Sequence, residues 1–169
     1  MSKNLIIGYG NPDREDDGVA WHILRALALQ FGCGHADTFN GSLFDIDLGE
    51  PQHRADIPDL QLELQLMPEV SETLADYDKV CFVDAHTGAL ARELNMEPIT
   101  ARVQNSPFTH HLTPEMCLQL AKSAYGKTPQ GMVVSVRGYQ FGFAHTLSPQ
   151  TAQLAVEAVQ RITAWIKES

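Results

Sequence analysis

The chain has 169 residues, and its 21 aspartates and glutamates against 12 lysines and arginines give a formal net charge of -9. This length suits one domain with a substantial core, so we expect a single domain over residues 1–169. No run of basic residues accumulates, which excludes nucleic acid and anionic membrane surfaces as expected partners. No apolar stretch approaches the roughly 18 residues that span a bilayer, and the first residues lack a signal-peptide pattern. We expect a cytoplasmic monomer that lies outside membranes.

The first elements along the chain are a strand, an acidic loop and a helix. Leu5-Ile6-Ile7 is an apolar run before a glycine, which is typical of a buried strand. Residues 19–31 carry apolar side chains at helical spacing, and Gly32 is expected to end that helix. Between these elements, residues 8–18 read GYGNPDREDDG, with four acidic side chains in the five positions 13–17. We therefore expect strand, acidic loop and helix as the opening unit.

In the middle of the chain, a segment that is harder to interpret is followed by three predicted strands. Residues 33–59 are punctuated by glycine and proline and are expected to leave the core. Residues 60–66 alternate strictly between apolar and polar, as a strand with one solvated face does, and a short helix follows. Residues 79–83 form a second continuous apolar strand that ends at Asp84. Renewed alternation predicts a further strand over residues 99–103.

The last third of the chain contains two helix starts. Thr113-Pro114 and Ser148-Pro149 are both N-cap residues followed by proline, and they predict helices that begin at these points. Residues 132–136 are the last clear core strand between them. Strands that alternate with helices, and whose inner members are continuously apolar, predict an α/β fold. We expect a three-layer α/β/α sandwich built on a mostly parallel, twisted sheet.

Polar side chains follow several of the predicted strands, at the edge of the sheet where ligands collect in open α/β folds. These candidates are Asp16 and Asp17 in the acidic loop, Asp84 with His86 two residues later, and His110-His111 before a capped helix. A carboxylate, a second carboxylate and an imidazole favour a divalent metal site. Imidazole suits nickel, zinc, iron and copper better than calcium or magnesium. The alternative for each residue is a structural role, such as capping a helix or meeting its dipole.

Two other kinds of site fit the sequence less well. A dinucleotide site needs a third glycine where Asp13 stands, and no lysine offsets the carboxylates that would face a phosphate. The pocket is therefore expected to attract a cation. A nucleophilic thiolate of Cys81 or Cys117 paired with His110 is the weaker alternative to metal chemistry, since both residues lie in apolar surroundings. With Cys33 they form an odd, widely spaced set, which we interpret as buried thiols in a reducing compartment.

The motifs resemble those of the [NiFe]-hydrogenase maturation proteases. Residues 7–12, IGYGNP, with Asp16-Asp17-Gly18-Val19 resemble the N-terminal signature, and Phe82-Val83-Asp84-Ala85 resembles the second motif. Residues 109–114, THHLTP, stand where the family places its metal-binding histidine. Short matches at residues 66–69 and 141–149 resemble one branch of the family. The resemblance spans nearly the whole chain in order, with residues 33–59 unmatched.

This resemblance implies a metal-dependent endopeptidase, a hydrolase that removes the C-terminal extension of a nickel-loaded hydrogenase large-subunit precursor. It implies Asp17, Asp84 and His110 as the catalytic and metal-contacting residues, with nickel supplied by the precursor. His111 directly follows and is the alternative histidine, and His86 is an extra donor near Asp84. A non-proteolytic metal-binding maturation chaperone of the same fold is the alternative function.

The remaining acidic residues of the loop are given supporting roles. Asp16 is expected to support the loop and the helix start, and Asp13 and Glu15 are expected to be solvated charges at the rim. The chain departs from the family in two places. Residues 66–69 replace a Gly-Gly-Thr segment of many members, which leaves open which precursor is processed. Ala20 replaces the second glycine of the usual Gly-x-Gly and is interpreted as a packing change.

Overall fold

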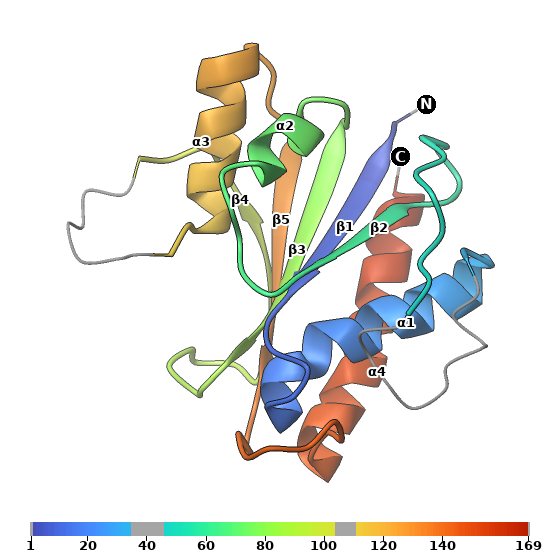
Figure 1. The fold of residues 1–169 in the computed structure, drawn as a ribbon, viewed down its shortest axis with the longest axis vertical. Coiled ribbons are helices and arrows are strands. Elements are labelled where there is room, and N and C mark those ends of the chain that lie inside the picture. The colour runs from blue at the N-terminus through green and yellow to red at the C-terminus, as the bar shows by residue number, and fades with distance from the viewer. Residues whose placement is uncertain (1, 35–45, 104–110, 169) are drawn as a thin grey trace.

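The computed structural model describes residues 2–34, 46–103 and 111–168, and a five-stranded sheet runs through it (Figure 1). Four strands are parallel, namely β1 (Asn4–Tyr9), β2 (Asp59–Glu63), β3 (Lys79–His86) and β5 (Gln130–Arg137), and the antiparallel edge strand is β4 (Leu94–Ile99). Their order across the sheet is β2-β1-β3-β5-β4. The predicted mostly parallel sheet is confirmed.

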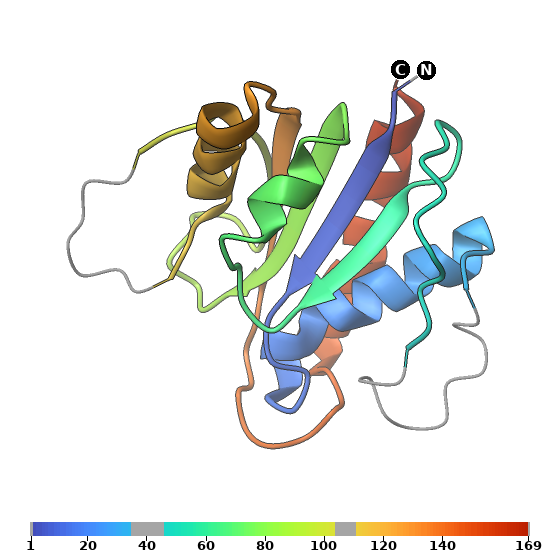
Figure 2. The ribbon, with the colours of Figure 1, turned by 45° about the horizontal axis from the view of Figure 1, so that its top comes forward.

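Helices cover both faces of the sheet (Figure 2). On one face lie α1 (Val19–Phe31) and α4 (Pro149–Lys167), which contact each other. On the other face lie α2 (Val70–Leu74) and α3 (Pro114–Tyr125). Side chains that alternate along the inner strands supply two separate cores, so that Ile6 packs toward α1 and α4 while Ile7 packs toward α2 and α3. The three-layer α/β/α sandwich is confirmed.

The helix boundaries agree with the local signals in the sequence. Thr113 Oγ1 accepts a hydrogen bond from Met116 N at 3.3 Å, as an N-cap does. Gly32 and Gly126 adopt left-handed backbone conformations directly after α1 and α3, which lets each helix end there. These boundaries depend on residues within one turn of the helix end, so they could be predicted without tertiary information.

The strand predicted over residues 99–103 is wrong, because β4 occupies Leu94–Ile99 instead. β4 runs antiparallel to β5, and its last pair joins Ile99 to Gly131 near the start of β5. Continuing this register sets Thr100 opposite Gln130, the first residue of β5, so β4 has almost no partner left beyond Ile99. For the same reason β2 ends at Glu63 and does not continue to residue 66, since Glu63 pairs with Tyr9, the last residue of β1. The extent of each edge strand is set by its neighbour.

Two further expectations concern the whole chain. Within the described parts of the chain, no helix is both long and apolar enough to cross a membrane. Cys33, Cys81 and Cys117 are buried as free thiols, as expected.

Candidate functional site

The strand order of the sheet reverses at the C-terminal ends of β1 and β3. From β1 the chain crosses to β2 on one side, and then crosses back to β3 on the other side. Open α/β sheets bind ligands at such switch points. Here β1 ends in the glycine loop and β3 ends at Asp84 and His86. The C-terminal ends of β1 and β3 are therefore the candidate site.

The strand register places one side chain from each of β1, β3 and β5 side by side at this end of the sheet. Gly8 pairs with Val83, so Tyr9 follows beside Asp84, and Asp84 pairs with Ser135 of β5. The Tyr9 hydroxyl donates to Asp84 Oδ2 at 2.8 Å, and the Ser135 hydroxyl donates to Asp84 Oδ1 at 2.9 Å. The carboxylate of Asp84 is thus held by one hydroxyl on each oxygen. Sequence reasoning did not single out Tyr9 or Ser135, and only the register could have identified them.

Asp84 and Asp17 act on each other electrostatically. The pKa of Asp84 is raised, chiefly because burial disfavours its charged form, and the charge of Asp17 adds to the rise. Hydrogen bonds from Tyr9 and Ser135 and the charge of His86 act in the opposite direction. The short helical turn η1 (Glu15–Gly18), which carries Asp17, contacts β3. The structure therefore places Asp17 within electrostatic range of Asp84, and negative charge on both side chains would favour a cation between them.

The glycine turn holds the carboxylate of Asp17 in place. Asp17 Oδ2 accepts a hydrogen bond from Asn11 N at 2.9 Å. Gly10 has a φ of 139°, and a Cβ at this position would lie 2.2 Å from the Asp17 carbonyl oxygen, so only glycine fits. Trp21 Nε1 donates to Gly10 O at 3.0 Å and anchors the turn to α1. A turn that resembles a phosphate loop in sequence here positions a carboxylate.

Asp16 is fully buried and joins the acidic loop to residues 138–148, which we call the clasp segment. Its Oδ2 accepts from Tyr139 N at 2.8 Å and Gln140 N at 2.9 Å. Ser148 supplies two further bonds, from N to Oδ1 and from Oγ to Oδ2, both 2.7 Å long. Burial alone would raise the pKa of Asp16, but these four hydrogen bonds outweigh it and lower the pKa. These bonds confirm that Asp16 supports the loop, whereas its expected support of the start of α1 stays a prediction.

Asp13 and Glu15 also contact the clasp segment. Asp13 Oδ1 lies 2.5 Å from His145 Nε2, and Glu15 Oε2 accepts from Gly142 N at 2.6 Å. Both side chains lie at the surface, but the expectation that they are simply solvated is wrong. Three of the four acidic side chains of the loop therefore bind the clasp segment. Asp17 is the one that acts on Asp84.

The low pKa of Asp16 predicts a loss of stability in acid. A carboxyl whose pKa is lower in the folded chain than in the unfolded chain stabilises the fold above its ordinary pKa, and this contribution disappears as the pH falls through the folded value. We expect the free energy of unfolding of the wild type to drop more steeply below about pH 4 than that of Asp16→Asn. Urea denaturation at pH 7, 5, 4 and 3 measures this, and parallel profiles for the two proteins would contradict it.

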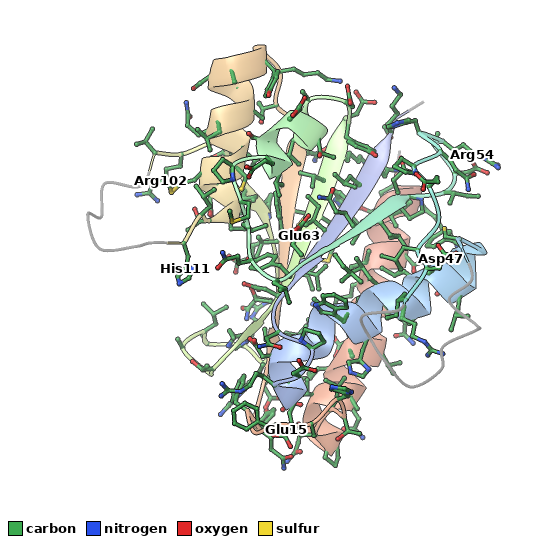
Figure 3. All side chains as sticks on the ribbon, viewed as in Figure 1. Glu15, Asp47, Arg54, Glu63, Arg102 and His111 are labelled. Carbon is green, nitrogen blue, oxygen red and sulfur yellow. The ribbon has the colours of Figure 1, made fainter. Side chains whose placement is uncertain are left out.

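Of the three candidate histidines, the structure describes His86 and His111. His86 lies near Asp84, but Gly88 N donates to its Nδ1 at 3.1 Å and its Nε2 lies 3.3 Å from Glu93 O. These two contacts tie the His86 ring to the backbone of the β3–β4 loop. His110 lies outside the described residues. His111 is exposed just before α3 (Figure 3).

No complete three-ligand metal site is present in residues 2–34, 46–103 and 111–168, because no three histidine, cysteine, aspartate or glutamate side chains come close enough to hold one ion. Asp17 and Asp84 stay the predicted pair of metal-contacting carboxylates. The described geometry does not add His86 or His111 to this pair as a third ligand.

The cysteines are poor candidates for a nucleophile. Burial raises the pKa of Cys117 to about 11, and burial also raises the pKa of Cys81 well above its ordinary value. Both thiols are therefore protonated at neutral pH, whereas the nucleophile in thiol chemistry is the thiolate. The weaker alternative of a cysteine nucleophile loses its chemical basis.

Comparison with known protein families gives no match by sequence, and no curated protein matches either. Solved structures do match over nearly the whole chain. The [NiFe] hydrogenase maturation protease HycI from Thermococcus kodakarensis is 17% identical with a TM-score of 0.61, and the match covers 99% of this chain and 94% of that one. The hydrogenase maturating endopeptidase HybD from E. coli is 18% identical with a TM-score of 0.63, covering 98% and 93%.

A third solved structure extends this pattern. The hydrogenase 2 maturation peptidase from a Thaumarchaeota archaeon is 19% identical with a TM-score of 0.61, and the match covers 99% of both chains. At these identities the likeness establishes a shared fold. The resemblance inferred from short motifs is therefore confirmed at the level of the three-dimensional structure.

Proposed function

We propose that this protein is an endopeptidase that removes the C-terminal extension of a nickel-loaded [NiFe]-hydrogenase large-subunit precursor. The observation that carries the proposal is the position of Asp84 at the switch point of the sheet, where the turn that carries Asp17 contacts β3. Two carboxylates that repel each other suit a cation that arrives with the substrate. The fold is shared with proteins named as hydrogenase maturation proteases, which supports this choice of substrate.

In this proposal Asp17 and Asp84 hold the nickel that the precursor carries. A divalent ion at the scissile bond polarises the carbonyl or activates a water molecule. Asp84 enters the reaction already oriented by Tyr9 and Ser135. The resemblance to the family assigns the third contact to His110, the residue just before His111 and the first turn of α3. With the precursor bound, its own groups complete the coordination of the metal.

Cleavage of a nickel-loaded precursor tests the proposal directly. Purified protein is mixed with the large-subunit precursor, with and without nickel, and the mass of the precursor is followed. We expect a mass loss that equals the C-terminal extension, only in the nickel-loaded sample. Binding of the precursor without any mass loss would instead identify a non-proteolytic metal-binding chaperone. Gel filtration of the same protein tests the proposed monomer.

A further inference from the structure

Within the described residues, a side-chain hydroxyl donates to each oxygen of Asp84. Asp17 instead accepts a hydrogen bond from the backbone N–H of Asn11. Tyr9 and Ser135 reach it from β1 and β5, the two strands that flank β3. An ionised carboxylate has about four acceptor positions, two on each oxygen. One hydroxyl on each oxygen leaves each with a position for another partner. The arrangement fixes the carboxylate without closing it to a ligand.

We propose that Tyr9 and Ser135 are positioning residues that orient Asp84 to bind a divalent cation together with Asp17. The inference rests on the proposed function, because it takes the cation of that function as the ligand. Carboxylates that bind metals are themselves hydrogen-bonded by outer partners, which fix their orientation. Losing such a partner leaves the ligand in place but free to rotate, so affinity falls while the fold remains.

A second tyrosine–aspartate pair in the same chain separates positioning from packing. Tyr77 donates its hydroxyl to Asp59 Oδ2 at 2.9 Å, nearly the same distance as between Tyr9 and Asp84. Asp59 is the first residue of β2. This pair therefore lies where the parallel strands begin, whereas the candidate site lies where they end. Asp59 also accepts from the backbone N–H groups of Gln52 and His53, which marks it as a structural anchor. Tyr77→Phe is therefore a matched control for Tyr9→Phe.

Titration of the full chain with Ni²⁺ by calorimetry tests the inference. We expect Tyr9→Phe and Ser135→Ala each to weaken Ni²⁺ binding about tenfold or more, the usual effect of removing an outer partner of a metal ligand. Tyr77→Phe should bind Ni²⁺ as the wild type does, although it loses an equivalent hydrogen bond. Thermal unfolding of all three variants shows whether each remains folded. Both tyrosine variants keep the aromatic ring, so packing is preserved.

A double-mutant cycle shows whether Tyr9 acts through Asp84. In an Asp84→Asn background, Tyr9→Phe should cause no further loss of Ni²⁺ affinity, because the group that it positions is no longer a carboxylate. The visible absorption spectrum of bound Co²⁺ gives an independent signature. We expect this spectrum to change in Tyr9→Phe and to stay unchanged in Tyr77→Phe.

Three results would overturn the inference. These are wild-type Ni²⁺ affinity in Tyr9→Phe, an equal loss in Tyr77→Phe, or no Ni²⁺ binding by the wild type either alone or with the precursor. Failure of the proposed function gives a different result. Ni²⁺ binding that depends on Tyr9, in a protein that does not cleave the loaded precursor, would overturn the endopeptidase and leave the positioning role standing.

Discussion

Asp17→Asn is expected to slow cleavage of the nickel-loaded precursor by more than about a hundredfold, because removing even an outer partner of a metal ligand costs roughly ten- to a hundredfold. The amide removes the negative charge that the cation needs. Its oxygen can still accept the hydrogen bond from Asn11 N, so the glycine turn should keep its shape. Single-turnover cleavage followed by mass spectrometry measures the rate.

His86→Ala is the control for this prediction. His86 also lies beside Asp84, but its ring nitrogens contact the backbone of the β3–β4 loop. We expect His86→Ala to retain cleavage and to lose only some stability. Cleavage by Asp17→Asn at the wild-type rate would show that Asp17 does not hold the metal. Loss of cleavage in His86→Ala would show that the imidazole takes part in the reaction.

Asp16→Ala is expected to lower the free energy of unfolding by about 3–5 kcal/mol, because it strips the acceptor from several buried donors at once. These donors are three backbone N–H groups and the Ser148 hydroxyl. Asp16 is fully buried, so water cannot easily replace the carboxylate. Urea denaturation at pH 7 measures the difference from the wild type.

Asp13→Ala supplies the comparison within the same loop. Its contact with His145 lies between two side chains that are each about half exposed, and exposed pairs of this kind contribute less than about 1 kcal/mol. A loss in Asp16→Ala as small as the loss in Asp13→Ala would contradict the anchoring role. In the expected case, Asp16→Ala should also reduce cleavage, since Asp17 is the next residue and depends on the same loop.

The large part of the fold that could be predicted from the sequence depends on local signals. The limits of α1 and α3 follow from caps, glycines and helical spacing, which act within a few residues. The strand predicted over residues 99–103 was misplaced because an edge strand extends only as far as its partner. β4 pairs with β5, which begins at Gln130. The alternation of residues 99–103 carries no information about where that partner begins.

The candidate site divides in the same way. Asp17 and Asp84 could be predicted, because each carboxylate follows an apolar strand and parallel strands end at the same edge of a sheet. The partners of Asp13, Glu15 and Asp16 could not, because the clasp segment lies more than a hundred positions away along the chain. The acidic pattern predicts rim charges at Asp13 and Glu15 and a supporting role for Asp16, but it does not identify their partners. The hydrogen bonds show that most of them anchor a second segment.

By itself, the sequence of this protein determined the α/β class, the helix limits and the two strand ends that carry carboxylates, because short-range spacing and apolar patterning control these features. Only the tertiary structure shows which segment Asp13, Glu15 and Asp16 anchor and which hydroxyls hold Asp84. Both depend on the register of β1, β3 and β5 and on the approach of the clasp segment. These contacts join residues that are distant in the chain, so their geometry arises only when the sheet assembles.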